Sequence, residues 1–62
     1  MEDYIDFITT IDYTDKARTV YRCEDYTSAL GYYSSAILDK NVKSASISYP
    51  SGKIAKSMSK DV

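Results

Sequence analysis

Apolar and polar side chains alternate with a period of two near the beginning of the chain. From residue 3 to residue 13 most odd positions are apolar or β-branched and most even positions are polar; the odd positions after Asp3 are Ile5, Phe7, Thr9, Ile11 and Tyr13. This alternation predicts a β-strand with one buried face. Tyr4 and Ile8 are the apolar exceptions on the even face, and we expect them to form a second contact surface.

A second alternating segment, residues 18–23, follows a polar turn, so the two segments are predicted to form a β-hairpin. The length of the loop decides which side chains share a face of the sheet. A two-residue loop would pair Ile11 with Val20 and turn both arginines of the second strand onto the apolar face. We favour an odd-numbered loop that pairs Ile11 with Tyr21, because it turns the arginines outward. The side chains that it brings together are Phe7, Ile11, Tyr21 and Cys23.

The apolar spacing changes to steps of three and four after Asp25, which predicts an amphipathic helix from about Tyr26 to Lys40. Asp25 is a favourable N-cap, because its carboxylate can accept hydrogen bonds from the first backbone amides. Asn41 is expected to close the helix in the left-handed conformation. The stripe that should pack on a sheet consists of Tyr26, Ala29, Leu30, Tyr33, Ala36 and Ile37.

The last third of the chain predicts a second hairpin. Residues 42–49 alternate between apolar side chains and a row of serines, and residues 53–58 follow the turn-forming sequence Pro50-Ser51-Gly52. Ile54 and Met58 are expected to point inward on the last strand. The serine row is expected to face solvent or to pair with another sheet edge.

These elements predict an α+β fold of the order β-β-α-β-β, with one helix packed on one face of a four-stranded, mainly antiparallel sheet. The chain of 62 residues forms a single domain, residues 1–62, close to the lower size limit for a stable core. The helix leaves the opposite face of the sheet bare. A second copy of the chain would extend the core, so we expect a homodimer.

The charges are unevenly distributed, although the net charge is only −1. The first fifteen residues contain five carboxylates and no Lys or Arg, whereas five lysines and one aspartate lie from residue 40 onward. Either the acidic first strand lies near the basic last strand and each screens the other, or the two ends face different partners or meet across a dimer.

The residues that usually carry catalysis are scarce: the chain has no His, one Cys and two Gly. This composition excludes a histidine-dependent triad and argues against a metal site, so no cofactor, no metal and no enzymatic activity are expected. Cys23 is interpreted as a buried apolar residue rather than a reactive thiol. The apolar runs are too short to cross a membrane. A lone cysteine and the lack of a signal-peptide pattern predict a cytoplasmic protein.

The region from Arg18 to Lys56 resembles small phage-encoded proteins of β-β-α-β-β architecture that act in host takeover or against host defence. The segments that carry the resemblance are Thr19-Val20-Tyr21-Arg22, Asp25-Tyr26-Thr27-Ser28-Ala29, Val42 to Tyr49 and Pro50-Ser51-Gly52-Lys53. The resemblance implies binding to a host protein, commonly as a homodimer, in the host cytoplasm.

We therefore expect a small non-enzymatic protein-binding module, a homodimeric inhibitor of a larger host protein such as an antiviral defence component. Tyrosine is enriched at interfaces, and a glycine inside a helix permits close approach of another backbone, from this chain or a second copy. The candidate interface residues are Tyr4, Ile8, Tyr13, Gly31 and Tyr32. Ordinary half-buried packing is the competing interpretation of the tyrosines.

The alternative is a small nucleic-acid-binding protein. Its basic C-terminal hairpin would neutralise phosphates with lysines and stack a base on Tyr49. A structural subunit of a larger assembly is a third possibility.

Overall fold

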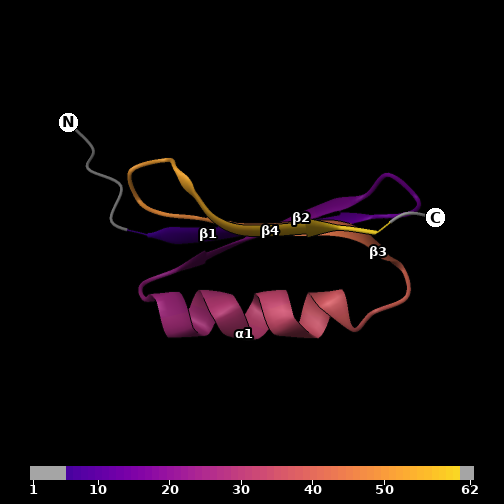
Figure 1. Ribbon diagram of the computed structural model, residues 1–62, viewed down its shortest axis with the longest axis horizontal. Helices are drawn as coiled ribbons and strands as arrows, with labels where there is room; N and C mark the ends of the chain where they lie inside the picture. Colours follow the sequence, from indigo (N-terminus) through magenta and orange to yellow (C-terminus); the bar gives the residue numbers. More distant parts are fainter. Residues whose placement is uncertain (1–5, 61–62) are drawn as a thin grey trace.

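The computed structural model describes residues 6–60 and contains four strands and one helix. All neighbouring strands are antiparallel, and their spatial order is β2-β1-β3-β4. The helix lies on one face of the sheet (Figure 1). The predicted α+β fold is therefore confirmed. The elements are β1 (Phe7–Tyr13), β2 (Arg18–Cys23), α1 (Tyr26–Ile37), β3 (Val42–Ser48) and β4 (Ile54–Ser59).

The first hairpin has a loop with an odd number of residues, as predicted. Lys16 adopts a left-handed conformation with φ +74°, which closes the turn tightly. The arginines of β2 consequently face away from α1. The predicted register was nevertheless wrong by two residues, because the tighter loop places Ile11 opposite Thr19 rather than Tyr21. Such a shift by two preserves the face of every side chain.

The helix begins as predicted and ends earlier. The Asp25 carboxylate accepts a hydrogen bond from the Ser28 amide at 2.8 Å, which confirms the N-cap. The last helical residue is Ile37, and Asn41 is not left-handed, contrary to the prediction. The chain turns instead through Asp39, whose side chain accepts from the Asn41 amide at 2.8 Å.

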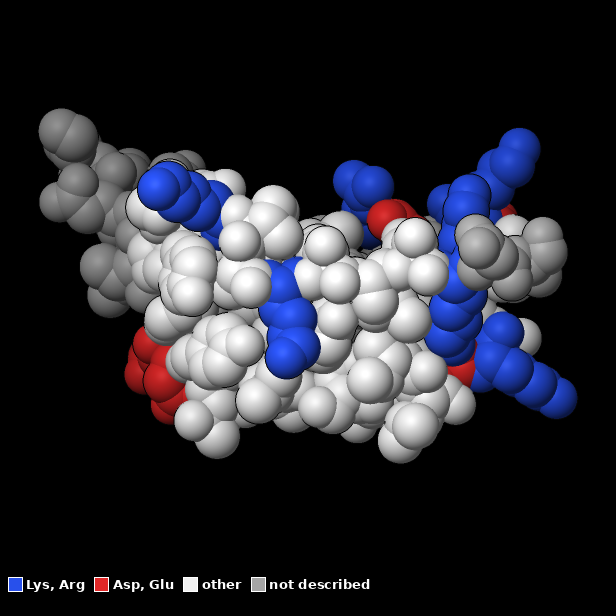
Figure 2. Space-filling view, viewed as in Figure 1, with Lys and Arg blue, Asp and Glu red and all other residues white. Residues whose placement is uncertain are grey.

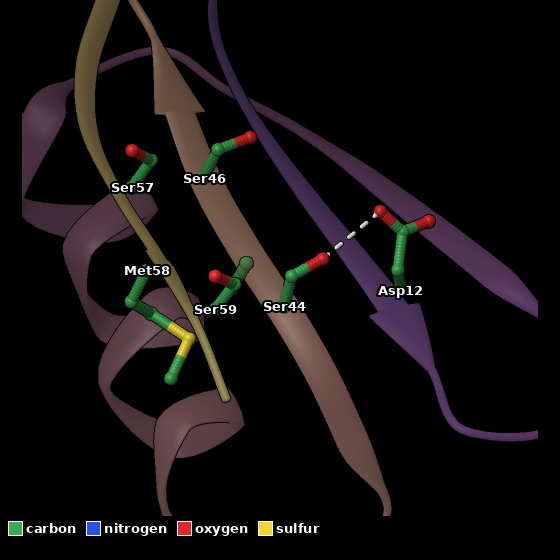
Figure 3. Close-up of a pocket in the computed structure, with 7 residues that line it drawn as sticks. Asp12, Ser44, Ser46, Ser57, Met58 and Ser59 are labelled. Carbon is green, nitrogen blue, oxygen red and sulfur yellow. Dashed lines mark hydrogen bonds between the residues drawn. The ribbon is translucent and has the colours of Figure 1, made fainter. Parts of the chain in front are cut away.

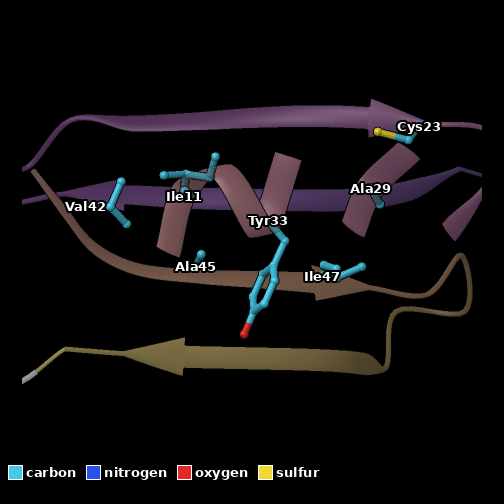
Figure 4. Close-up of a cluster of buried hydrophobic side chains, with 8 residues drawn as sticks. Ile11, Cys23, Ala29, Tyr33, Val42, Ala45 and Ile47 are labelled. Atoms are coloured by element: carbon cyan, nitrogen blue, oxygen red, sulfur yellow. The ribbon is translucent and has the colours of Figure 1, made fainter. Parts of the chain in front are cut away.

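The core lies between α1 and the sheet (Figure 4). The predicted helical stripe is confirmed, because each of its residues is buried or packs against the buried cluster. The ring of Tyr33 extends across β3 towards β4 in Figure 4. The buried apolar residues are Ile11, Cys23, Ala29, Tyr33, Ala36, Val42, Ala45 and Ile47.

A β-bulge in the second hairpin changes the direction of side chains at the start of β4. Ile47 lies opposite Lys56, but Ser48 lies opposite Ile54, so Ala55 is an extra residue on β4. The bulge turns Ile54 to the solvent, with 57% of its surface exposed, and the prediction that it points inward was wrong. Met58 packs against the core as predicted.

No helix within residues 6–60 has the length and apolar character needed to cross a membrane.

Candidate interaction surfaces

The face of the sheet opposite α1, here called the open face, consists of three cross-strand rows of side chains. Within residues 6–60 no second layer lies over it (Figure 1). Its side chains follow from the strand registers, because residues directly opposite one another point to the same side. The rows are Arg18, Asp12, Ser44 and Ser59; Val20, Thr10, Ser46 and Ser57; and Arg22, Ile8, Ser48 and Ile54.

The charges of the open face are paired within the chain. Arg18 donates from Nε to Asp12 at 2.6 Å and from Nη2 at 3.3 Å. The hydrogen bond from Arg18 is the main reason why the pKa of Asp12 lies below its ordinary value. Ser44 also donates to this carboxylate, at 3.3 Å, and Arg22 lies 3.6 Å from Asp6. A partner that covers this face would therefore not have to bury unpaired charges.

Serine hydroxyls occupy the half of the open face formed by β3 and β4. They line a shallow depression of about 420 Å³ (Figure 3). Ser44 lies opposite Ser59 and Ser46 lies opposite Ser57, so these serines are two pairs of cross-strand neighbours. This half of the face is polar and uncharged, and exposed Ile54 lies at the β4 end of the neighbouring row. The predicted serine face is thus present and solvent-accessible.

A second surface, the helix flank, consists of Ser28, Gly31, Tyr32 and Ser35 on the side of α1 next to β2. The ring of Tyr32 stacks on Tyr21 of β2, with the ring centroids 4.0 Å apart and the planes 7° apart. Tyr32 remains 44% exposed. A Cβ added at Gly31 would meet nothing within 4 Å, so no other segment within residues 6–60 approaches it closely, contrary to one of the two expectations for this glycine.

The predicted interface residues do not form one patch. Ile8 lies on the open face, whereas Gly31 and Tyr32 lie on the helix flank on the other side of the sheet. Tyr13 is half-buried and packs against the core, in agreement with the ordinary packing interpretation. Tyr4 lies outside the described residues.

Exposed lysines line the edge formed by β4. Lys and Arg side chains spread along this side of the molecule (Figure 2). Lys53 and Lys56 form no ion pair with any residue in the described part of the chain, and Lys60 donates to the backbone carbonyl of Asp39 at 2.7 Å. The expectation that the last strand screens the first was wrong, because β3 separates β1 from β4 and the nearest cations of β1 come from β2.

Cysteine and carboxylate side chains are the remaining candidates for chemistry among the described residues. Residues 6–60 contain no group of three or more His, Cys, Asp or Glu side chains that could hold a metal ion. Cys23 is buried as predicted, and burial, together with Asp25 and Asp6, raises the pKa of its thiol. The Asp25 carboxylate is engaged in capping α1.

Sequence reasoning missed two contacts on these surfaces. The pairing of Asp12 with Arg18 could have been found by testing a three-residue loop, which places the two residues opposite each other. The stack of Tyr21 on Tyr32 has no signal in the sequence, because it depends on where the helix lies across the sheet.

Comparison of the chain with protein-family models, curated proteins and solved structures finds no match.

Proposed function

We propose that this chain is a non-enzymatic protein-binding module that acts as a homodimer and inhibits a larger protein by covering part of its surface. The observation that carries the proposal is the open face, a sheet surface with compensated charges and no second layer among the described residues. Small domains commonly use such faces and their edges for association.

The composition of the open face suits a protein partner. Val20 and Ile54 are 51% and 57% exposed and provide apolar contact area at opposite edges. The serine pairs between them offer hydroxyls that can donate and accept hydrogen bonds. Protein interfaces combine apolar contact area with hydrogen bonds, and the open face offers both. The half-buried Ile8 lies in the same row as Ile54.

The class of partner, a host protein such as an antiviral defence component, is proposed from the resemblance to small phage-encoded proteins. Inhibition follows from size, since a chain of 62 residues bound to a larger protein acts most simply by occluding a surface. The serine-lined depression is open to solvent, and no group of described residues could hold a metal ion there.

The test compares Ile8→Asp with Ser34→Asp, which places the same charge on an exposed position of α1. Each tagged variant is used to capture partners from a bacterial lysate, and the captured protein is then purified and assayed with and without the chain. The wild type and Ser34→Asp should bind and inhibit, whereas Ile8→Asp should lose at least tenfold in affinity. Equal loss in both variants, or binding without inhibition, would contradict the proposal.

Nucleic-acid binding at the β4 edge is the second candidate. It is favoured by Lys53 and Lys56, which lack ion pairs among the described residues, and by Tyr49, which is 45% exposed in the same hairpin. Binding to single-stranded DNA should weaken steeply between about 50 and 200 mM salt, and Lys53→Glu with Lys56→Glu should abolish it while Lys16→Glu does not. Absence of binding at low salt removes this candidate.

A further inference from the structure

The two edges of the sheet differ in how well they are protected from another strand. β4 carries Lys56, is preceded by Lys53 and is interrupted by a bulge, and these features discourage pairing with a further strand. β2 pairs with β1 without any register shift and contains no Lys, Pro or Gly. Its sequence, RTVYRC, is rich in residues that favour strands. Only the β2 edge is therefore suited to pairing.

The arginines of β2 do not protect this edge. Arg18 is held over the neighbouring strand by two hydrogen bonds to Asp12, and Arg22 lies beside Asp6. Both arginine charges are therefore paired with aspartates on the side of β2 that faces β1, away from the open edge. Val20 between them is 51% exposed and uncharged.

The hydrogen-bond pattern shows which main-chain groups of β2 point outward. The Tyr13 amide donates to the Ala17 carbonyl at 2.8 Å, which makes these two residues a hydrogen-bonded pair. Hydrogen-bonded and non-hydrogen-bonded pairs alternate along antiparallel strands. Thr10 and Val20 are accordingly a non-hydrogen-bonded pair, and the N–H and C=O of Val20 point to the open edge.

We propose that a second copy of the chain pairs antiparallel along β2, with Val20 facing its own copy at the two-fold axis, to form a continuous eight-stranded sheet. This inference rests on the proposed homodimer and adds the edge of the sheet through which the two copies pair. In this register Val20 exchanges two hydrogen bonds with Val20 of the other copy. Arg18 faces the other copy's Arg22, and each guanidinium remains paired with an aspartate of its own copy.

A second copy fits this edge better than an unrelated strand because the helix flank continues the same surface. A two-fold axis normal to the sheet leaves both helices on one face. Since α1 packs mainly on β1 and β3, a strand spacing of about 4.8 Å places the two helix axes about 19 Å apart. That distance exceeds the usual helix contact distance of about 10 Å, and in the proposed dimer the stacked rings of Tyr21 and Tyr32 from each copy lie between the helices. The serines and glycine of the helix flank leave room for these rings.

The first experiment measures the solution mass over a wide concentration range, together with hydrogen exchange of individual amides by NMR. Ser57 provides the matched reference, because its main-chain groups also point outward, at the β4 edge. At concentrations where the mass is that of a dimer, the Val20 amide should exchange at least tenfold more slowly than on dilution to the monomer. The Ser57 amide should be unchanged.

Matched substitutions at the two edges then test the geometry. Val20→Pro removes the outward N–H at the β2 edge, and Ser57→Pro does the same at the β4 edge; proline is tolerated at such positions. Val20→Lys and Ser57→Lys serve where a proline prevents folding. The Val20 variants should be monomers with wild-type circular dichroism, whereas the Ser57 variants remain dimers. Tyr32→Ala should weaken the dimer and Tyr32→Phe, which retains the ring, should not.

The outcomes separate the two proposals. A dimer whose Val20 amide exchanges as fast as in the monomer, or that survives Val20→Lys, would overturn pairing through β2 and leave the homodimer in place on another surface. A monomer at every concentration would overturn the homodimer and the edge pairing together, while the capture experiment with Ile8→Asp still decides binding to a larger protein.

Discussion

The Thr9 hydroxyl donates a hydrogen bond to the backbone carbonyl of Ala29 at 3.1 Å, which ties the central strand β1 to α1 inside the core. Neither residue has any exposed surface. Thr9 occupies a core-facing position of β1, where its neighbours on the same face are Phe7 and Ile11. Its hydroxyl is satisfied by the helix. A buried hydroxyl with a partner fixes how the helix lies along the sheet, because a shift of the helix would leave that group unsatisfied.

Thr9→Val keeps the shape of the side chain and removes this hydrogen bond. We expect a loss of about 0.5–1.5 kcal/mol in the free energy of unfolding, measured by urea denaturation. Thr10→Val makes the same chemical change on the open face and should stay within about 0.5 kcal/mol of the wild type. If Thr9→Val is as stable as the wild type, the bond does not orient the helix.

Two isoleucines test the bulge in β4. Ile47 is fully buried and Ile54 is 57% exposed. Ile47→Ala should lower the free energy of unfolding by about 2–5 kcal/mol, because it leaves a cavity in the core. Ile54→Ala should cost less than about 1 kcal/mol by the same measurement. Equal losses would mean that Ile54 points inward and that the bulge is misplaced.

The two glycines are expected to respond in opposite directions to alanine. Gly31 lies inside α1 with open space around it in a single copy, so Gly31→Ala should raise the stability of the monomer by up to about 1 kcal/mol. Gly52 has φ +98° in the turn between β3 and β4, where an alanine is strained, so Gly52→Ala should lower the stability. Thermal unfolding at a fixed protein concentration checks both. A destabilising Gly31→Ala would indicate a close neighbour supplied by a second copy.

Acid is expected to weaken the fold through Asp12 and Asp25. Hydrogen bonds from Arg18 and from the Ser28 amide hold the pKa of the respective carboxyls below the ordinary value. A carboxyl with a lowered pKa in the folded state contributes stability above its unfolded pKa, and this contribution is lost as the pH falls through the folded pKa. Urea denaturation should show stability falling below about pH 4.

Asp25→Asn is the control for this pH dependence, because asparagine can still cap the helix but does not titrate. It should reduce the fall in stability below about pH 4, and Asp12→Asn should do so as well. Unchanged acid sensitivity in both variants would assign the effect to other carboxylates.

The spacing of apolar residues along the chain was sufficient to predict most of the fold. The alternation of Phe7, Thr9 and Ile11 and the helical spacing of Ala29, Tyr33 and Ala36 placed the core-facing side chains correctly. These predictions succeeded because side-chain direction follows directly from strand and helix periodicity. The predicted helix end and the direction of Ile54 failed because turns and a bulge, which periodicity does not encode, interrupt the regular pattern.

The candidate surfaces were only partly predictable. A bare sheet face follows from having one helix for four strands, and Ile8 was placed on it from the sequence. The pairing of Asp12 with Arg18 depends on the register of the first hairpin, and the contrast between the two sheet edges depends on strand order. Pairwise spacing along the chain contains no information on that order.

The sequence by itself determined the elements, their order along the chain and most of the side chains that they bury, since these depend on neighbours a few residues apart. Only the tertiary structure decided that β1 and β3 occupy the centre, that Tyr32 stacks on Tyr21, and that β2 forms an edge without lysines. Strand order and stacking arise from contacts between residues distant in sequence, which are selected by the packing of the whole core rather than by any local pattern.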